Sequence, residues 1–534
     1  MGDAFLTRRR LLAAAGLALA SLVGRGSTAW GAARPLLDGL RVGAGRAFAG
    51  DGRRLATVGR AGRATARLRF RLARPAVVTF DVLQTGQGVA SEQPLGVRRT
   101  GLSAQRLKLP AGAHTLDWTP DPALPPRTYV LRLSARSGGK THVEQATVRV
   151  LGVDAGFTVG SVRQGGSAGL VVRTDARSLR LQLLRCGPET EETYANDELK
   201  GVPVGEPVEH DWSRRQNAPA ALYLAFPAEL PSGIYAARLD ADDGRVGFAP
   251  IVVAPAVPAH RVAVVVPVTT WQAYNFYDED GDGWGDTWYA RWRTRELDLR
   301  RPHARRGVPY RFRSYELGFY HWLFRRGVEV DWYADGDLEA VDPAALREAY
   351  DLLVFPGHTE YVTAALYDAV AGFRDRGGNL LFLSANNFFR RVDREGNRVR
   401  LVDEWRKLGR PESALCGVQY IASDRGERHA PFTVTGADLA PWAFEGTGLA
   451  NGSQFGLYGI EIDARASTSP PGTTVLATLP DLFGPGRSGE MVYYEHPSGA
   501  RVFSAGVLNF GGQVLLWPEA TRLLENVWRR LGGP

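Results

Sequence analysis

The 534-residue chain has two cysteines and little lysine, and beyond its first 33 residues it lacks any long hydrophobic run. Cys186 and Cys416 lie far apart in different expected domains, so we expect two buried thiols rather than a disulfide bond. No later segment reaches the roughly 20 apolar residues of a spanning helix, which predicts no membrane span. Arginine supplies nearly all of the net charge of +8, but acidic residues are interleaved with it, so nucleic-acid binding is not expected.

Common catalytic motifs are also absent. The chain has no GxSxG elbow, no HExxH pair, no phosphate loop and no dinucleotide fingerprint. Its nine histidines are scattered without a close pair, which argues against a histidine-rich zinc site. Within residues 260–534, no cysteine follows an expected strand where a nucleophile would need to lie, which excludes cysteine-based hydrolysis. The chemistry that remains is that of tyrosine, carboxylate and amide oxygens.

The first 33 residues resemble a twin-arginine export signal. The run from Thr7 to Leu12 contains three arginines, an apolar stretch continues to Val23, and small residues from Ala29 to Ala33 suit cleavage. An ordinary secretory signal is the alternative. Either way we expect a periplasmic or extracellular protein.

Two β-rich domains are expected next. The segment from Leu124 to Leu133 and that from Leu230 to Leu239 each combine a proline turn with alternating apolar residues, as two copies of one unit would. The fold class we predict is therefore all-β plus α/β. Immunoglobulin-like β-sandwiches at about 40–150 and 153–255 precede an α/β domain at 260–534.

Within the α/β domain, strands at Val262–Val266, Asp351–Phe355 and Asn379–Leu383 are short apolar runs typical of buried parallel strands. Residues 328–332 form another expected strand, after a helix over 317–326. A helix capped by Thr363 lies between the second and third of these runs, an antiparallel strand pair follows at 490–494 and 500–505, and a helix at 519–531 closes the chain. Residues 403–485 are loop-rich, and we expect an insertion over the sheet edge.

Polar residues follow these strands where a sheet of this kind forms ligand sites. His358 and Glu360 come after one strand, and Asn386 comes after the next. Tyr274 follows the first strand of the domain and is expected on the same rim. Tyr235, at the proline turn of the second sandwich, and Glu495, at a later strand end, complete the candidates.

These residues carry a family resemblance. From about Val153 onward, the pieces LPSGIYAARL, TTWQAYNFY, PGHTEY, FLSANNF and MVYYEHPSGARVFSAG occur in order. Together they resemble the large subunit of N,N-dimethylformamidase and its family. The resemblance implies a sandwich joined to a glutamine-amidotransferase-like α/β domain. It also implies hydrolysis of a small N-substituted amide at one ferric ion held by two tyrosines and a glutamate.

By motif, the resemblance places the iron ligands on Tyr235, Tyr274 and Glu360. Phenolate and carboxylate are hard anionic donors that suit Fe(III). The neighbouring polar residues would be His358, Asn386 and Glu495. Of these, Glu495 is expected to act as general base, Asn386 to bind the developing oxyanion, and His358 to orient the site or move a proton.

Each assignment has an alternative. Tyr235 could be a structural corner of the sandwich, since Tyr129 occupies the same place in the first β copy. Tyr274 could instead pack in the core, or Tyr277 could be the ligand in its place. The polar residues could have structural roles instead. Glu360 could cap a helix and His358 could brace a loop. Asn386 could form a turn, and Glu495 could make a buried salt bridge.

A second constellation consists of carboxylates at loop positions 1, 3, 5 and 9 with glycine at 6. It is formed by Asp278, Asp280, Asp282 and Asp286, with Gly283 between them. The spacing copies the start of a calcium loop, although Tyr289 stands where the closing glutamate belongs. A structural Ca²⁺ ion that braces the neighbouring site is the hypothesis, and a solvated acidic turn is the alternative.

Taken together, the sequence predicts an exported, iron-dependent amidohydrolase of small amides. The alternative is a non-catalytic protein that binds cell-surface glycan or protein. The export leader and the extra N-terminal sandwich depart from the characterised enzymes of the family, which are cytoplasmic and have a small partner subunit. Whether this chain needs such a subunit, or pairs with further copies of itself, is left open.

Overall fold

The computed structural model describes residues 35–44, 56–58, 65–84, 98–99, 105–121, 124–216, 219–289, 294–424 and 426–532. The expected leader, residues 1–33, lies outside the described residues. With 42% strand and 17% helix, the structure agrees with a mixed α/β plus all-β class. Among the described helices, none combines the length and the apolar character that crossing a bilayer requires.

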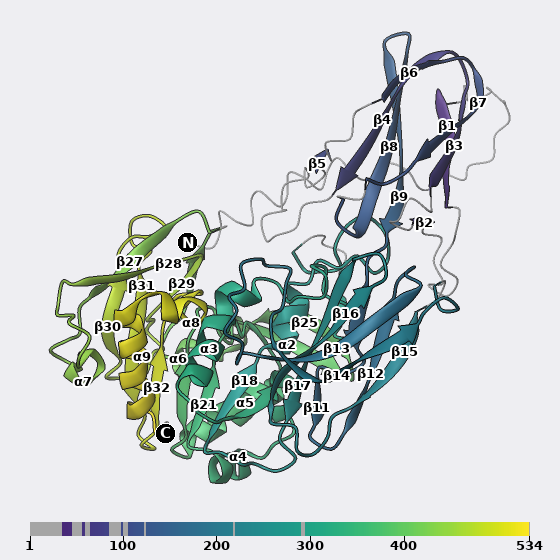
Figure 1. Ribbon diagram of the computed structural model, residues 1–534. Coiled ribbons are helices and arrows are strands. Elements are labelled where there is room, and N and C mark those ends of the chain that lie inside the picture. Colours follow the sequence, from purple (N-terminus) through teal and green to yellow (C-terminus); the bar gives the residue numbers. More distant parts are fainter. Residues whose placement is uncertain are drawn as a thin grey trace, which may run out of the picture.

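The first β-rich unit stands apart from the body of the molecule at the top of Figure 1. Two sheets face each other across an apolar core that includes Leu68, Tyr129 and Leu131. One sheet has the order β1 (Leu37–Ala44), β3 (Ala66–Leu72), β7 (Gly112–Trp118). The other has the order β2 (Ala56–Val58), β9 (Lys140–Val150), β8 (Arg127–Ser137), β4 (Ala76–Gln84), β5 (Arg98–Arg99), with β6 (Gln105–Leu109) paired to β4.

The second β-rich unit repeats this arrangement, with Trp212, Tyr235 and Leu239 in its core. Its smaller sheet has the order β10 (Asp154–Phe157), β12 (Ser167–Arg173), β15 (Ala220–Ala225). Its larger sheet has the order β11 (Ser161–Arg163), β17 (Val246–Ala254), β16 (Gly233–Ala241), β13 (Ser178–Cys186), β14 (Val202–Asp211). Cys186, in β13, and Cys416 are buried free thiols, which confirms that expectation.

A nine-stranded sheet forms the α/β part. Its order is β20 (Asp331–Ala334), β18 (Val262–Val266), β21 (Leu352–Phe355), β23 (Asn379–Phe382), β32 (Arg501–Ser504), β31 (Gly489–Glu495), β30 (Thr474–Leu479), β27 (His429–Val434), β28 (Gln454–Gly459). The first five strands are parallel. Strands β20, β18 and β21 are buried throughout, and β23 and β32 are buried except for their first residues, Asn379 and Arg501. The predicted antiparallel pair is confirmed as β31 and β32.

The helices of this part follow their sequence signals. The side chain of Thr363 accepts a hydrogen bond from the N–H of Leu366, which caps α5 (Ala364–Asp375) as expected. Helix α3 (Gly318–Arg325) and the closing helix α9 (Pro518–Arg530) are also where the apolar periodicity predicts them. Helices α2 (Val268–Ala273) and α4 (Pro343–Ala349) complete the elements next to the parallel strands.

Residues 403–485 are not an insertion over the sheet edge, and that expectation was wrong. Strands β27, β28 and β30 continue the main sheet beyond β31 with antiparallel pairing. A separate antiparallel pair, β26 (Gln419–Ser423) with β29 (Glu461–Ala464), flanks β27 and β28 in the sequence and returns the chain toward the parallel strands. This return is what brings residues of the region into the candidate site.

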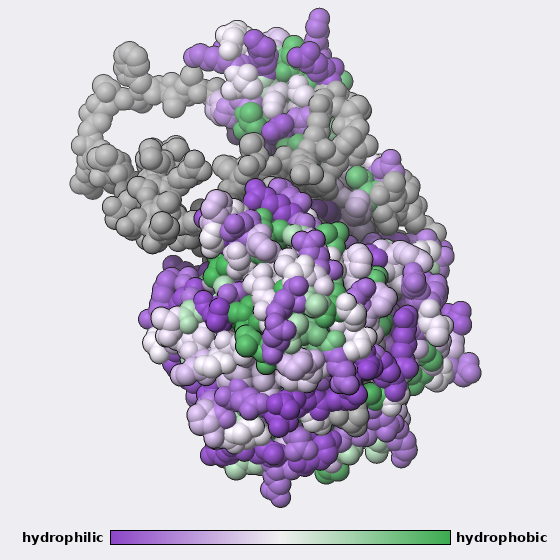
Figure 2. Space-filling model, turned by 90° about the vertical axis from the view of Figure 1, so that its left-hand side faces the viewer, coloured by the Kyte–Doolittle hydropathy of each residue, from purple (hydrophilic) through white to green (hydrophobic). Residues whose placement is uncertain are grey.

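The outer face of the sheet extension carries some apolar surface. Leu457 on β28 is 47% exposed, and Leu439 and Leu516 from other segments of the C-terminal part are more exposed still. Figure 2 looks onto this side and shows apolar residues gathered near the middle, with a polar band below them. A small subunit or a second copy of the chain stays a prediction.

One continuous core joins the second sandwich to the main sheet. It contains Ile234 and Val252 of the sandwich together with Val264 and Trp332 of the sheet. The join is close enough that Gly307 has no room for a side chain, because a Cβ there would lie 1.6 Å from the carbonyl oxygen of Phe248. Next to it, the N–H of Phe248 donates to the carbonyl of Arg306 at 2.7 Å.

We therefore expect Gly307→Ala to destabilise the protein by about 2–4 kcal/mol, from the clash and from a positive φ of 92°. Gly205→Ala is the control, because Gly205 also has a positive φ but no atom within 4 Å of the added Cβ. Chemical denaturation of both variants measures the difference. Equal losses would contradict a close packed join at Gly307.

Candidate metal and active site

Three tyrosine hydroxyls surround the carboxylate of Glu360. The hydroxyl of Tyr274 donates to Oε2 of Glu360 at 2.6 Å, and that of Tyr289 lies 3.0 Å from the same oxygen. The Tyr289 hydroxyl also lies 2.9 Å from the Tyr274 oxygen and hydrogen-bonds the hydroxyl of Tyr361. Glu360, Tyr274 and Tyr361 are each 6% exposed or less, so these oxygens meet away from bulk water.

The backbone explains this convergence. Tyr274 is the residue at which helix α2 ends, so it does not follow strand β18 directly as the sequence had suggested. Glu360 lies beyond β21, and Tyr361 is the first residue of β22 (Tyr361–Val362). The backbone N–H of Tyr361 donates to the hydroxyl of Thr270 in α2 at 3.2 Å. The loop from Tyr274 to Tyr289 is closed by Thr287, which donates to the carbonyl of Ala273 at 2.5 Å.

A second carboxylate lies beside the first. Oε2 of Glu461 accepts from the side-chain amide of Asn386 at 2.9 Å. The Nε2 atom of His358 lies 3.4 Å from Glu360 and 3.7 Å from Glu461, between the two carboxylates. The structure thus brings together His358, Glu360, Asn386 and Tyr274, as expected from the strand ends.

Burial sets the protonation of the whole cluster. It raises the pKa of all three phenols well above 10, and the nearby charge of Glu360 raises them further. Burial also raises the pKa of Glu360, and it raises that of Glu461 well above its usual value, with the Glu360 charge adding to the effect. Desolvation lowers the pKa of His358 to about 3, so its imidazole is neutral.

Asn386 is held in an unusual conformation. Its φ is 56°, a left-handed region that asparagine tolerates better than most residues. Its N–H donates to both carboxylate oxygens of Asp463 at 2.9 Å, and burial raises the pKa of Asp463 to about 8. Since the side-chain amide is already engaged with Glu461, the arrangement positions that carboxylate.

Tyr235 does not join this cluster. Its hydroxyl donates to the carbonyl of Pro231 at 2.7 Å, and its ring is fully buried in the core of the second sandwich. Tyr129 makes the same contact with Pro125 at 2.7 Å in the first sandwich. The geometry is that of a tyrosine corner, in which the hydroxyl braces the turn that precedes its strand. The expected ligand role for Tyr235 is therefore corrected.

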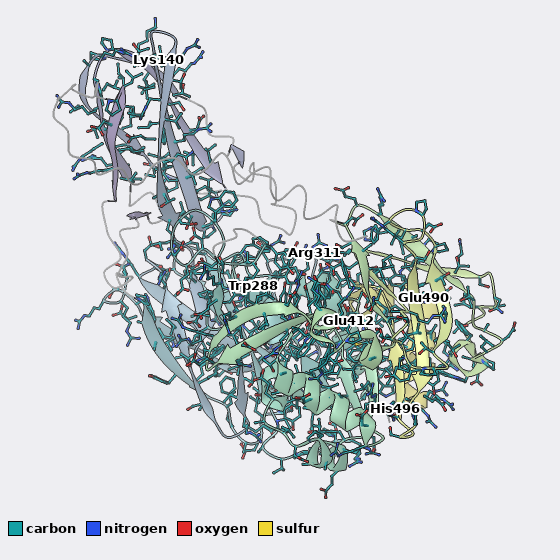
Figure 3. The ribbon with its side chains drawn as sticks, turned by 180° about the vertical axis from the view of Figure 1, so that it is seen from behind. Lys140, Trp288, Arg311, Glu412, Glu490 and His496 are labelled. Carbon is teal, nitrogen blue, oxygen red and sulfur yellow. The ribbon has the colours of Figure 1, made fainter. Side chains whose placement is uncertain are left out.

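Glu495 is also elsewhere, and its expected burial was wrong. Its side chain is 54% exposed, and it accepts hydrogen bonds from Tyr493 at 2.6 Å and Arg530 at 2.8 Å. Figure 3 shows its chain neighbour His496 far from Trp288, whose ring centre lies 4.9 Å from that of Tyr361 in the site. The second carboxylate of the site is Glu461.

Tyr289, Tyr361 and Glu461 are the residues that sequence reasoning missed. Two of them had a signal: Tyr361 directly follows Glu360, and Tyr289 takes the place of the missing calcium-loop glutamate. For Glu461 no local signal exists, because it lies on β29 inside the loop-rich region 403–485.

The acidic loop 278–286 forms a carboxylate group, although not with all four predicted members. Oxygens of Asp278, Asp280 and Asp286 lie within 4.8 Å of one another. Asp282 is outside the group, and its carboxylate accepts from the N–H of Trp284 at 2.8 Å. Calcium at this loop stays a prediction.

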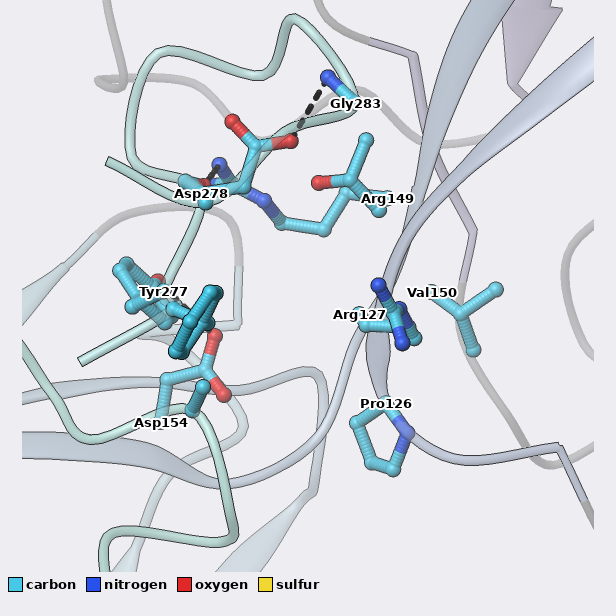
Figure 4. A pocket seen from close by; sticks show the side chains of 12 residues that line it. Pro126, Arg127, Arg149, Val150, Asp154, Tyr277, Asp278 and Gly283 are labelled. Carbon is cyan, nitrogen blue, oxygen red and sulfur yellow. Dashed lines mark hydrogen bonds between the residues drawn. The ribbon is translucent and has the colours of Figure 1, made fainter. Parts of the chain in front are cut away.

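The same loop is clamped by the first sandwich. Arg149 donates to the carbonyl of Asp278 at 2.5 Å, and Thr147 donates to that of Gly281 at 2.7 Å. Figure 4 shows the Arg149 side chain extending toward Asp278, with Tyr277 and Asp154 on the same side of the small pocket and Arg127 and Pro126 across from them. Because Tyr274 and Tyr289 flank this loop, the first sandwich braces the segment that carries both phenols.

Residues 203–516, more than half of the chain, match the model of a protein family described as N,N-dimethylformamidase beta subunit-like, C-terminal. The chain belongs to this family. The matched segment contains the whole Tyr274–Glu360–Glu461 cluster. No curated protein is similar enough to count as a match.

Similarity to solved structures is remote for this dimethylformamidase-like chain. Salmonella alpha-2-macroglobulin reacted with methylamine is 8% identical with a TM-score of 0.22, over 41% of this chain and 16% of that one. The native conformation of E. coli alpha-2-macroglobulin is 11% identical with a TM-score of 0.23, over 40% and 16%. The chain thus spans about a sixth of the length of these proteins, and likeness at this level supports no inference.

Another buried carboxyl group of the dimethylformamidase-like chain lies behind the His358 loop. Glu316 accepts from the indole N–H of Trp271 at 2.8 Å and from the hydroxyl of Tyr320 at 2.7 Å. It packs so tightly that a Cβ on Gly357 would lie 2.3 Å from its Cγ. Burial raises the pKa of Glu316 to about 7.

This raised pKa predicts a pH-dependent stability. Because the folded pKa of Glu316 exceeds the unfolded value of 4.5, its contribution is complete below about pH 4.5 and is lost as the pH rises to about 7. We expect the unfolding free energy of the wild type, relative to Glu316→Gln, to fall over this window by at most about 1.4 kcal/mol per pH unit. Denaturant titrations of both proteins from pH 4.5 to 8 measure it, and a constant difference would contradict a buried, titrating Glu316.

Proposed function

We propose that this chain is an iron-dependent hydrolase of small N-substituted amides. The family supports the dimethylformamidase-like activity, and the convergence of Tyr274, Tyr289 and Glu360 supports the iron. Two phenols and one carboxylate are the ligand types that the family resemblance implies. In this proposal Tyr289 replaces Tyr235 as the second phenol ligand.

The chemistry of the cluster fits a trivalent cation. All of its candidate donors are hard oxygens, which suit Fe(III). The buried phenols stay protonated beside Glu360 unless a positive charge offsets their raised pKa values. In addition, Nε2 of His358 and Oδ1 of Asn386 are buried without a hydrogen-bond partner among the described residues. Such orphaned polar atoms are expected where a bound group completes a site.

The remaining residues have roles that follow from their contacts. When bound, the ferric ion supplies Lewis-acid polarisation of the amide carbonyl and a lowered pKa for water. Glu461, whose pKa burial raises, is placed to take a proton from water and return it to the departing amine. Asn386 orients Glu461, and the neutral imidazole of His358 offers a hydrogen bond between the two carboxylates.

The surrounding assignments belong to the same proposal. The two β-sandwiches are immunoglobulin-like and the α/β part is glutamine-amidotransferase-like, supported by the sheet orders and the parallel strands. Export by the twin-arginine route is supported by the arginine-containing leader sequence, and this route carries proteins that are already folded.

Tyr274→Phe and Tyr289→Phe should each lower the iron content of the purified protein by about tenfold or more, because each removes a phenolate donor. The visible band expected from charge transfer between phenolate and iron should disappear with it. Elemental analysis and an absorption spectrum measure both quantities.

Tyr235→Phe is the matched control. It should keep its iron and its colour while losing about 1–2 kcal/mol of stability, because the carbonyl of Pro231 loses its donor. Iron that survives in Tyr274→Phe and Tyr289→Phe but is lost in Tyr235→Phe would refute the proposed ligand set.

A further inference from the structure

Arg390 is the cationic side chain that connects the buried cluster with solvent. Strand β24 (Arg390–Glu395) pairs in parallel with β22, which sets Arg390 opposite Tyr361, and its N–H donates to the carbonyl of Glu360 at 2.9 Å. Its side chain is 30% exposed, whereas that of Glu360 is 3% exposed. The Arg390 side chain is therefore partly open to water, while its guanidinium lies 3.9 Å from the buried carboxylate.

The guanidinium of Arg390 is held only by long contacts. Its nearest carboxylate oxygens belong to Glu360 at 3.9 Å and Glu404 at 3.7 Å, both beyond hydrogen-bond distance. Its central carbon lies 4.7 Å from the centre of the Phe389 ring, a cation–π contact that restricts where the group can lie. Within the described part of the chain, no side-chain hydrogen bond from Arg390 is formed, so its N–H donors remain available.

Two other arginines near the site are already committed. Arg406 also lies over Phe389, at 4.9 Å, but it pairs with Glu412 and donates to the carbonyl of Tyr420 at 3.0 Å. Arg311 is hydrogen-bonded to Tyr310 and Tyr315. Of these three arginines, Arg390 is thus the one whose side-chain N–H groups form no hydrogen bond to a described residue.

We propose that Arg390 selects amides that carry a carboxylate, by pairing with that carboxylate on the solvent side of the site. A planar guanidinium offers two parallel N–H donors that match a carboxylate, and the cation–π contact with Phe389 reduces the side-chain entropy lost on pairing. A dianion such as phosphate fits less well, because Glu360 and Glu404 would repel the additional charge. This substrate class rests on the proposed amide hydrolysis.

The test compares N-acetylglycine with the neutral N-methylacetamide, with binding to the purified protein measured by calorimetry or ligand-detected NMR. The wild type should bind N-acetylglycine the more tightly, and Arg390→Gln should reduce that preference about 10- to 100-fold. Arg391→Gln is the control, because Arg391 is the next residue on the strand but pairs with Asp393 at 3.0 Å. Its preference should equal that of the wild type.

Absence of the preference in the wild type, or an equal reduction in both variants, would overturn the inference. So would inorganic phosphate binding as tightly as N-acetylglycine. Hydrolysis of N-formylglycine and N-methylformamide is followed separately. Arg390-dependent binding without any hydrolysis would refute the proposed function alone, while hydrolysis of the neutral amide without the binding preference would refute the Arg390 inference alone.

Discussion

The burial of Glu360 is the constraint on which the site depends. A carboxylate removed from water needs compensation, and here three phenol groups surround it while Arg390 stays at 3.9 Å. The charge of Glu360 in turn raises the pKa of the phenols and of neighbouring Glu461. The cluster therefore lacks a compensating positive charge of its own. A trivalent cation would supply that charge, and the phenols would then release their protons.

The fold meets this constraint by joining distant segments of the α/β part, which the first sandwich braces. Parallel strands β21 and β23 bring the His358 and Asn386 loops together, and the sheet extension returns Glu461 to the same place. The loop between the two phenols of the proposed ligand set is held by Arg149 of the first sandwich. The N-terminal unit is thus connected to the site, although none of its described residues contributes a side chain to the tyrosine cluster.

Much of the site could be predicted from local sequence, because parallel strands expose their carboxyl ends at one edge. His358, Glu360 and Asn386 follow from two apolar runs and their spacing alone. Tyr235 misled because a tyrosine after a proline turn looks the same whether it binds a ligand or braces a corner, and only its 2.7 Å contact with Pro231 decides. Glu461 was missed because its position depends on long-range pairing of β29 with β26 inside an irregular region.

The most direct test of the account is the position of the metal itself. Anomalous X-ray diffraction from crystals of the purified protein, recorded on both sides of the iron absorption edge, locates iron without assuming its ligands. The account predicts one iron peak within bonding distance of the oxygens of Tyr274, Tyr289 and Glu360. An iron peak at Tyr235 or at the Asp278–Asp286 loop would contradict it. So would the absence of an iron peak at the tyrosine cluster in protein that was supplied with excess iron.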